Sequence, residues 1–415
     1  MTKISTLTPF TQPKIVSYTG PPKSGKSWHL IGLLTSAEKS GLSKSKEFLV
    51  VKHPNDDKDS KGKISSSGKT NSIDALILEH PEQIANRVTS RTKHVVVSGA
   101  NFYEDESIVV LFKELLDSGR NIYFSGINLT YEGKPFNHIG KLMALADFHT
   151  LCKANCGVCD APANRSVQIE RAGQFHADPR CLTHWYADGR PDHKHYLKDQ
   201  QGFLVIKVGS MYSSKTESTI EEVSALKKPK GGYKVFFDQR YGEKKGIKTN
   251  DLRVFEAKEV SKADEILADV VANRYHAVLI DEAPFFEGIV EVAEKLVLQG
   301  HQVYMTSLLR DFRREPFPKV PELLCLADRI DNMHYGICNN IEFSEKRKCF
   351  HPAVETQRFI EKDRVKQPAS YNDPIILVGA TDSYTTSCRD CHRVLDEPKK
   401  TFDLPELMTD VYYGD

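Results

Sequence analysis

The sequence lacks any feature that would place it in a membrane. No apolar run reaches the roughly 18 residues that a transmembrane helix needs, so a membrane span is excluded. Lysine and arginine number 57 and aspartate and glutamate number 56, so the net charge of +1 gives no broad attraction to nucleic acid or to a membrane surface. The N-terminal segment also lacks the apolar core of a signal peptide. We expect a cytoplasmic protein that has neither nucleic acid nor membrane as a partner.

What the sequence does have is a large internal repeat. Landmarks of the first half recur in the same order in the second, four of them about 180 to 190 residues later and the last, a cysteine pair, about 207 residues later. Each unit is long enough to bury its own core, so the repeat predicts two duplicated domains, 1–190 and 200–415, with the boundary in the polar stretch 188–201. The landmarks are a glycine-rich loop (20–27 and 209–216), an apolar strand (from 94 and from 276), a KPF or EPF tripeptide (134–136 and 315–317), a LAD tripeptide (145–147 and 326–328), and a Cys-x-x-Cys/His pair (181/184 and 388/391).

Strand and helix patterns alternate along each half. Apolar strands are separated by helical patterns such as 107–119 and 288–300. This alternation is typical of an α/β fold in which helices flank a parallel sheet. We therefore expect one phosphate-loop α/β domain in each half, with a small zinc-bound subdomain attached.

The first glycine-rich loop matches the phosphate-loop pattern G-x-x-x-x-G-K-[ST]. Backbone N–H groups of such a loop wrap a phosphate, the lysine reaches the outer phosphates, and the final hydroxyl holds Mg²⁺. The alternative is a glycine-rich turn between a strand and a helix that carries a lysine by chance. The candidate ligands for ATP and Mg²⁺ in this loop are Gly20, Ser24, Gly25, Lys26 and Ser27.

The second loop departs from the pattern at one position. Ser214 replaces the usual second glycine, which is the residue that can adopt positive φ without strain. Its alignment with the first loop still predicts a phosphate loop by descent, although nucleotide affinity does not follow from that. The candidate ligands are Gly209, Ser210, Met211, Tyr212, Ser213, Ser214, Lys215 and Thr216.

An acidic pair follows an apolar strand in the second half only. Asp281 can bind Mg²⁺, and Glu282 can accept the proton of an attacking hydroxyl group. The alternative is a solvent-facing acidic pair at a strand end. The first half has Ser98 and Gly99 at this place, so we expect phosphoryl transfer in the second half alone.

Five sequence blocks together resemble the type II, zinc-containing thymidine kinases. The two loops are similar to the family's G-P-M-F-S-G-K-T, and 281–286 resembles D-E-[AG]-Q-F-F with Pro284 in place of Gln. Asp238-Gln-Arg-Tyr resembles D-x-R-Y, and 311–317 is similar to D-x-x-F-x-x-x-P-F. A closing block, 378–391, resembles V-G-G-x-x-x-Y-x-x-x-C-R-x-C.

The resemblance implies ATP and Mg²⁺ as cosubstrate and cofactor, and transfer of the γ-phosphate to the 5′-hydroxyl of thymidine or deoxyuridine in nucleotide salvage. It also implies that Glu282 is the base and that Lys215, Thr216 and Asp281 serve ATP and Mg²⁺. Asp238 and Arg240 would support the phosphate and sugar side, or form only a surface ion pair. The residues implied around the nucleoside are Met211, Phe312, Phe317, Gly379 and Tyr384, of which the two phenylalanines have core packing as the alternative.

The cysteines predict structural zinc rather than disulfides, because eight of the nine fall in two clusters with short spacings in a chain expected to be cytosolic. In the first half, two knuckles offer four ligands, the pattern of a closed tetrahedral site. In the second half one pair is intact, and either Cys349 or His334 would complete the broken pair; the alternative is a degraded site. The predicted ligands are Cys156, Cys159, Cys181 and His184, and then Cys338, Cys349, Cys388 and Cys391.

Three functions remain open from the sequence. The leading one is a tandem thymidine kinase-like enzyme with its chemistry in the second half and a degenerate first half as its packing partner, assembled as a homo-oligomer such as a dimer of tandem chains. The second is a non-catalytic nucleotide-binding or regulatory protein, suggested by Ser214, Pro284 and the broken cysteine pair. The third is a zinc-ribbon nucleic-acid binder, which the balanced charge disfavours.

Overall fold

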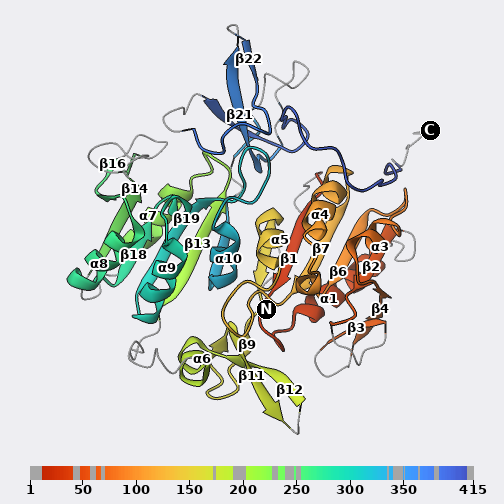
Figure 1. Ribbon diagram of the computed structural model, residues 1–415, viewed down its shortest axis with the longest axis horizontal. Coiled ribbons are helices and arrows are strands. Elements are labelled where there is room, and N and C mark those ends of the chain that lie inside the picture. Colours follow the sequence, from red (N-terminus) through yellow and green to blue (C-terminus); the bar gives the residue numbers. More distant parts are fainter. Residues whose placement is uncertain are drawn as a thin grey trace.

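The computed structural model describes residues 12–40, 47–56, 62–66, 71–171, 174–189, 202–226, 232–238, 247–248, 254–333, 336–339, 349, 351–362, 365–377 and 383–408. Two six-stranded sheets with the same strand order lie side by side (Figure 1). Every neighbouring pair within each sheet is parallel. The prediction of a duplicated parallel α/β fold is confirmed.

Equivalent strands hold equivalent places in the spatial order of the two sheets. The first sheet runs β5 (Leu76–Ile77), β2 (Phe48–Lys52), β6 (His94–Ser98), β7 (Asn121–Gly126), β1 (Ile15–Thr19) and β8 (Phe148–Leu151). The second runs β17 (Lys258–Val260), β14 (Tyr233–Asp238), β18 (Ala277–Ile280), β19 (Gln302–Leu308), β13 (Phe203–Gly209) and β20 (Arg329–Asn332).

Helices cover both faces of each sheet, as a parallel sheet requires. They are α1 (Lys26–Lys39), α3 (Pro81–Ala85), α4 (Ser107–Asp117) and α5 (Ile139–Leu145) in the first half, and α7 (Lys215–Ala225), α8 (Ala263–Asn273), α9 (Ile289–Leu298) and α10 (Val320–Leu326) in the second. One further helix, α6 (Leu182–Gly189), lies instead in the small subdomain beside β11 and β12 (Figure 1). Short 3₁₀ turns, η2 (Ala100–Phe102) and η4 (Ala283–Phe285), follow β6 and β18. Among the described residues, no helix is both long and apolar enough to cross a bilayer.

Smaller sheets extend from the two main ones. They are the hairpin β3 (Lys63–Ser65) and β4 (Ser72–Asp74), the pairs β9 (Ala154–Asn155) with β10 (Pro162–Ala163), β11 (Arg165–Arg171) with β12 (Gln174–Arg180) and β15 (Ile247–Lys248) with β16 (Val254–Phe255), and the sheet of β21 (Glu355–Lys362), β22 (Val365–Pro368) and β23 (Tyr384–Ser387). The subdomain with β11 and β12 and the subdomain with β21 and β22 lie at opposite ends of the molecule (Figure 1).

The central strands are buried on both faces because their side chains alternate between two helix layers. In β6, Val96 packs with α1 residues such as Leu30, whereas Val95 and Val97 join the α4 side with Phe112. The second half repeats this arrangement, with Leu279 of β18 facing the α7 side. Apolar residues on successive positions of a strand therefore indicate helices on both sides, as the sequence predicted.

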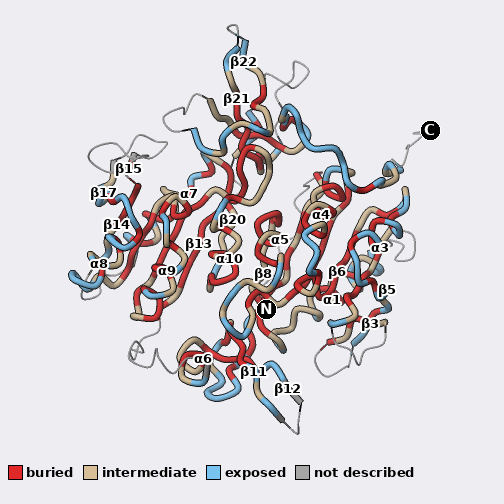
Figure 2. The backbone as a smooth tube through the Cα atoms, in the orientation of Figure 1, coloured by how far each residue is buried: buried red, intermediate tan, exposed pale blue. Residues whose placement is uncertain are grey.

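The two halves share one hydrophobic core. Helices α5 and α10 pack together between the sheets, and buried residues run through both helices (Figure 2). A Cβ atom on Gly140 of α5 would lie 2.6 Å from the carbonyl oxygen of Pro321 of α10, so the close approach of these helices needs glycine. Asn128 also donates a 2.8 Å hydrogen bond to the carbonyl of Cys325 across the same contact.

Buried ionic groups join the second small subdomain to the first half. Arg389 pairs with Asp147 of the first half and with Glu355 of β21, whose Oε1 is 3.3 Å from Arg389 Nε. Arg310 donates to Glu355 Oε2 over 3.0 Å and to the carbonyl of Leu145 over 2.9 Å. The pKa of Glu355 is lowered, because these guanidinium groups more than offset the burial that would raise it.

The end of the described chain returns to the first half. Glu114 of α4 accepts hydrogen bonds from the backbone N–H groups of Thr401 and Phe402, at 2.5 and 2.8 Å. Buried Arg120 donates to the carbonyl of Pro405 over 2.7 Å. The segment after the second small subdomain therefore packs on α4, across the boundary between the two sequence repeats.

Asp147→Ala should strongly destabilise the whole chain. It removes one of the two carboxylates that balance the buried Arg389 guanidinium and the acceptor of the 2.9 Å hydrogen bond from the Ile15 N–H group. Breaking one side of a buried ion pair costs about 3–5 kcal/mol. Urea denaturation measures the loss, and Asp74→Ala, which removes an exposed carboxylate paired with Lys63, is the control. Equal stabilities of the two variants would contradict the buried network.

Candidate functional site

The second phosphate loop lies between the end of β13 and the first turn of α7. Lys215 is 5% exposed, and its ammonium group donates 2.7 Å to the carbonyl of Ser210 and 3.4 Å to the hydroxyl of Ser213. Tyr212 and Ser214 both have φ of 58°. The serine that replaces glycine therefore does adopt the left-handed conformation that the glycine position requires.

The first loop has the same backbone form. Lys23 and Gly25 have φ of 61° and 84°, matching Tyr212 and Ser214 in the second loop. Lys26 donates 2.6 Å to the carbonyl of Pro21 and 3.3 Å to Ser24 Oγ. The two loops are thus built alike, with the lysine in each held by its own loop.

The acidic pair lies beside the second loop, at the carboxyl end of β18. Asp281 Oδ1 accepts hydrogen bonds from Thr216 Oγ1 at 2.8 Å and from Thr306 Oγ1 at 2.5 Å. Thr306 in turn accepts the backbone N–H group of Glu282 at 2.9 Å. Asp281 and the loop hydroxyl that would share a Mg²⁺ ion therefore already lie within hydrogen-bond distance, and both are oxygen donors of the kind this ion prefers.

Glu282 has the properties of a proton acceptor. Burial raises its pKa to about 7, with Asp281 adding to the rise and Lys215 opposing it. Its Oε2 is buried and has no hydrogen-bond partner among the residues that the structure describes. Its φ of 47° is strained for a non-glycine residue.

The first half has no acid on the corresponding strand. Ser125 and Thr306 occupy the same register beside their loops, and Ser98 and Asp281 are their neighbours on the adjoining strand. The next residue is Gly99, so this strand provides no base. A carboxylate does come close from the segment after β2, where Asp56 accepts 2.6 Å from Ser98 Oγ. Sequence reasoning missed Asp56, because its approach depends on the path of the chain after β2.

The residues expected around the nucleoside are only partly brought together. Phe312 is buried, and the guanidinium carbon of Arg358 lies 5.0 Å from its ring centre and 5.9 Å from that of Tyr384. Phe317 packs instead against Phe285 in the main core, at 5.3 Å between ring centres. Arg358 links Phe312 to Tyr384 and was not anticipated, since the sequence motifs do not extend to β21.

The remaining predicted residues fall at the edges of the site. The backbone N–H group of Met211 donates 3.2 Å to Thr356 Oγ1 of β21, which ties the loop to the second small subdomain. Asp238 is buried at the end of β14. Arg240, Gly379 and His334 lie outside the described residues.

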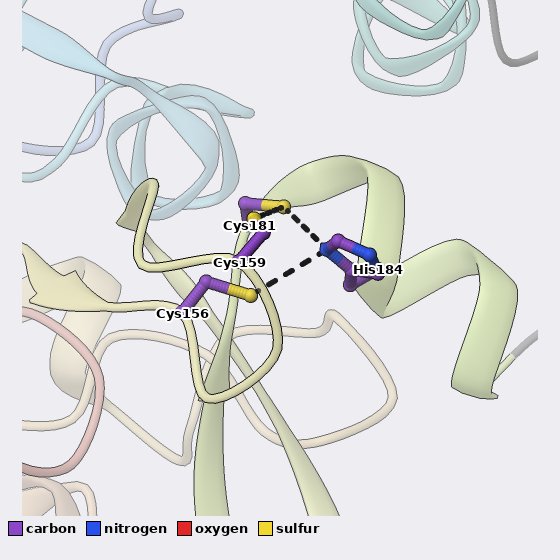
Figure 3. Close-up of side chains that lie close together, drawn as sticks. All are labelled: Cys156, Cys159, Cys181 and His184. Atoms are coloured by element: carbon purple, nitrogen blue, oxygen red, sulfur yellow. Dashed lines mark hydrogen bonds between the residues drawn. The ribbon is translucent and has the colours of Figure 1, made fainter.

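Four predicted metal ligands converge in the first half (Figure 3). Cys159 Sγ lies 3.8 Å from Cys181 Sγ, and His184 Nδ1 lies 3.2 Å from Cys181 Sγ and 3.6 Å from Cys156 Sγ. Tetrahedral zinc with bonds of about 2.3 Å to sulfur places its ligand atoms at such separations. The donor set and its spacing fit structural zinc.

A second cluster forms in the other half. Cys338, Cys349, Cys388 and Cys391 have ligand atoms that all lie within 4.8 Å of one another, and Cys349 Sγ is 3.6 Å from Cys388 Sγ. Cys349 therefore lies where the sequence needed a fourth ligand. Both clusters can hold a metal ion through four protein donors, which is the closed arrangement of a structural rather than a catalytic site.

The α/β fold, which is present twice, and the loop–carboxylate arrangement of the second half define a P-loop protein of the kinase type. A family model described as thymidine kinase matches residues 13–177 and 202–392, which together make up most of the chain. The protein therefore belongs to the thymidine kinase family and carries its domain twice.

Among solved structures, the chain resembles one titled "X-ray structure of the Legionella pneumophila ATPase DotB", with 12% identity over 36% of this chain and 43% of that chain, and a TM-score of 0.20. The match spans less than half of either chain, and a superposition this weak carries no argument about function.

Ser214→Gly should stabilise the protein, and Gly25→Ala should destabilise it. A left-handed conformation costs a non-glycine residue about 1 kcal/mol or more. A Cβ atom on Gly25 would meet no atom within 4 Å, so its positive φ alone determines the change in stability. We expect shifts of about 1 kcal/mol in opposite directions, measured by urea denaturation. Two changes of the same sign would show that the loops differ in backbone form.

Removal of metal should destabilise both small subdomains. Purified chain is expected to contain about two zinc ions, one for each four-donor cluster. Cys181→Ser should release one of them and lower the thermal midpoint, whereas Cys152→Ser, outside the cluster, should retain both. Metal analysis by mass spectrometry reads the count, and a metal-free wild-type chain with an unchanged midpoint on adding zinc would contradict this assignment.

Proposed function

We propose that the protein is an ATP-dependent deoxynucleoside kinase that phosphorylates the 5′-hydroxyl of thymidine or deoxyuridine, with its chemistry in the second half. Membership of the thymidine kinase family supports the reaction class. The observation that carries the assignment to the second half is that Lys215, Thr216, Asp281 and Glu282 converge there, whereas the first half has Gly99 at the position of the base.

The chemistry asks little of the protein beyond positioning and charge. Phosphoryl transfer needs an attacking oxygen, a phosphate held in place and compensation of developing negative charge. Mg²⁺, when bound, would neutralise phosphate charge, and Thr216 and Asp281 are the residues that would hold it. Lys215 then holds the outer phosphates, exchanging the loop carbonyl of Ser210 for phosphate oxygen.

Glu282 takes the proton from the nucleoside hydroxyl. Its unpartnered Oε2 is available to accept that proton, and a pKa near neutrality allows both uptake and release at physiological pH. Phe312 and Tyr384, joined through Arg358, form the aromatic side of the nucleoside site. Zinc in the second cluster supports this side, because Tyr384 and Cys388 lie at the start and just past the end of β23.

A non-catalytic nucleotide-binding protein is the competing function. The strained φ of Ser214 favours it, because a loop that resists its own conformation binds phosphate less well. Transfer of labelled phosphate to thymidine by the purified chain, with ATP and Mg²⁺, separates the two.

Glu282→Gln should lower turnover by at least about a hundredfold, because glutamine cannot accept the proton. Glu291→Gln, on an exposed position of α9, is the matched control and should retain wild-type turnover. Activity of Glu282→Gln equal to that of the control would remove the proposed base.

The wild-type pH profile gives an independent reading of the same group. Because burial raises the pKa of Glu282 to about 7, its ionised fraction falls as pH drops through neutrality. Turnover at pH 6 should be about tenfold lower than at pH 8. A profile that is flat between these values would show that no group with this pKa acts in turnover.

A further inference from the structure

The first half contains a cavity that the reaction in the second half does not use. Its volume is about 390 Å³, and its wall is formed by loop residues 22–28, by the ends of β3 and β7, and by the segments that follow β2 and β6. Lys26 lines this cavity, and burial lowers the pKa of its ammonium group to about 8. Asp56 is the one acidic residue among the described residues that line the cavity.

The Asp56 carboxylate of the first half lies close to the positions that correspond to Asp281 and Glu282 of the second half. Its carboxylate accepts a 2.6 Å hydrogen bond from Ser98 Oγ, at the strand position where the second half has Asp281. A Cβ atom on Gly99 would lie 2.5 Å from Asp56 Cβ, so a side chain at the position of Glu282 would exclude Asp56. A side chain at position 99 and Asp56 in its present position are therefore sterically incompatible.

The polar groups around Asp56 reproduce those of the second half. Ser98 Oγ lies 3.3 Å from Ser125 Oγ, where the second half has the contact of Asp281 with Thr306. Ser27 follows Lys26 at the start of α1, as Thr216 follows Lys215. A carboxylate and a hydroxyl beside a phosphate loop are the ligands that Mg²⁺ takes together with a polyphosphate.

An unpartnered donor also points to a ligand. Asn101 is 1% exposed and lines the cavity, and its Oδ1 accepts the Ile127 N–H group at 2.9 Å. Its Nδ2 is buried without a hydrogen-bond partner among the residues that the structure describes. A buried donor without a hydrogen-bond partner costs about 1–3 kcal/mol, and an acceptor oxygen of a ligand in the cavity would provide that partner.

We propose that the first half is a second binding site for a Mg²⁺–nucleoside triphosphate, in which Asp56 faces the cation, and that this nucleotide is held without phosphoryl transfer. The nucleotide would stay intact because the cavity has a single carboxylate. If Asp56 binds the cation, the described lining has no second acidic side chain to act as base. This site does not depend on turnover in the second half.

Trp28 offers a local reporter for the test. It lines the cavity directly after Ser27 and is 58% exposed, so a bound nucleotide should alter its fluorescence. The full chain carrying Lys215→Met, which disables the second loop, is titrated with the non-hydrolysable analogue AMP-PNP in Mg²⁺ or in EDTA. We expect a saturable signal that Trp28→Phe removes, with affinity about tenfold weaker in EDTA. The wild-type chain should give the same Trp28 signal, which guards against a folding defect in Lys215→Met.

Asp56→Asn tests the cation contact. It should abolish most of the difference between Mg²⁺ and EDTA, whereas Asp74→Asn, at an exposed position in the same half, should preserve that difference. The proposal is overturned if AMP-PNP gives neither a Trp28 signal nor calorimetric heat, or if Asp56→Asn keeps the parental dependence on Mg²⁺. Absence of kinase activity would count against the second half alone and would leave this result unaffected.

Discussion

The buried carboxylate of Glu355 is the contact on which the second site depends. It accepts hydrogen bonds from Arg310 and lies against Arg389, and through these two guanidinium groups it reaches α5 and Asp147 of the first half. The strand that starts at Glu355 then contacts the site directly: Thr356 accepts a hydrogen bond from the phosphate loop, and Arg358 packs on Phe312 and Tyr384. Without the first half, this strand would lose its anchor, so the shape of the second half depends on the first.

The two halves share the same backbone conformation but differ in the side chains at equivalent positions. At each of two positions with positive φ, one half has glycine and the other a larger residue: Gly25 against Ser214 in the loop, and Gly99 against Glu282 after the strand. The second half therefore accepts strain both in its loop and at Glu282, the residue that we propose as the base. The first half has glycine at both positions and is free of that strain.

Local patterns in the sequence were sufficient for the fold and the loops, because a phosphate loop, an apolar strand and a cysteine knuckle are each encoded by neighbouring residues. The repeat added the pairing of Ser98 with Asp281. Contacts between residues far apart in the chain could not be predicted from the sequence. Asp56 depends on how the chain leaves β2, Arg389 meets Asp147 only after both halves have folded, and the segment at 401–405 binds α4 across the repeat boundary. None of these is marked by spacing or periodicity.

The glycine that lets α5 approach α10 has a consequence for how such a protein can change. In an assembly of identical chains, every substitution appears in all subunits at once, so a residue needed in one site cannot be given up in another. In this chain Gly140 meets Pro321, a different residue of the same polypeptide, and each side of the contact is inherited separately. Joining the copies fixes their ratio at one to one, and a substitution in one copy leaves the other copy unchanged.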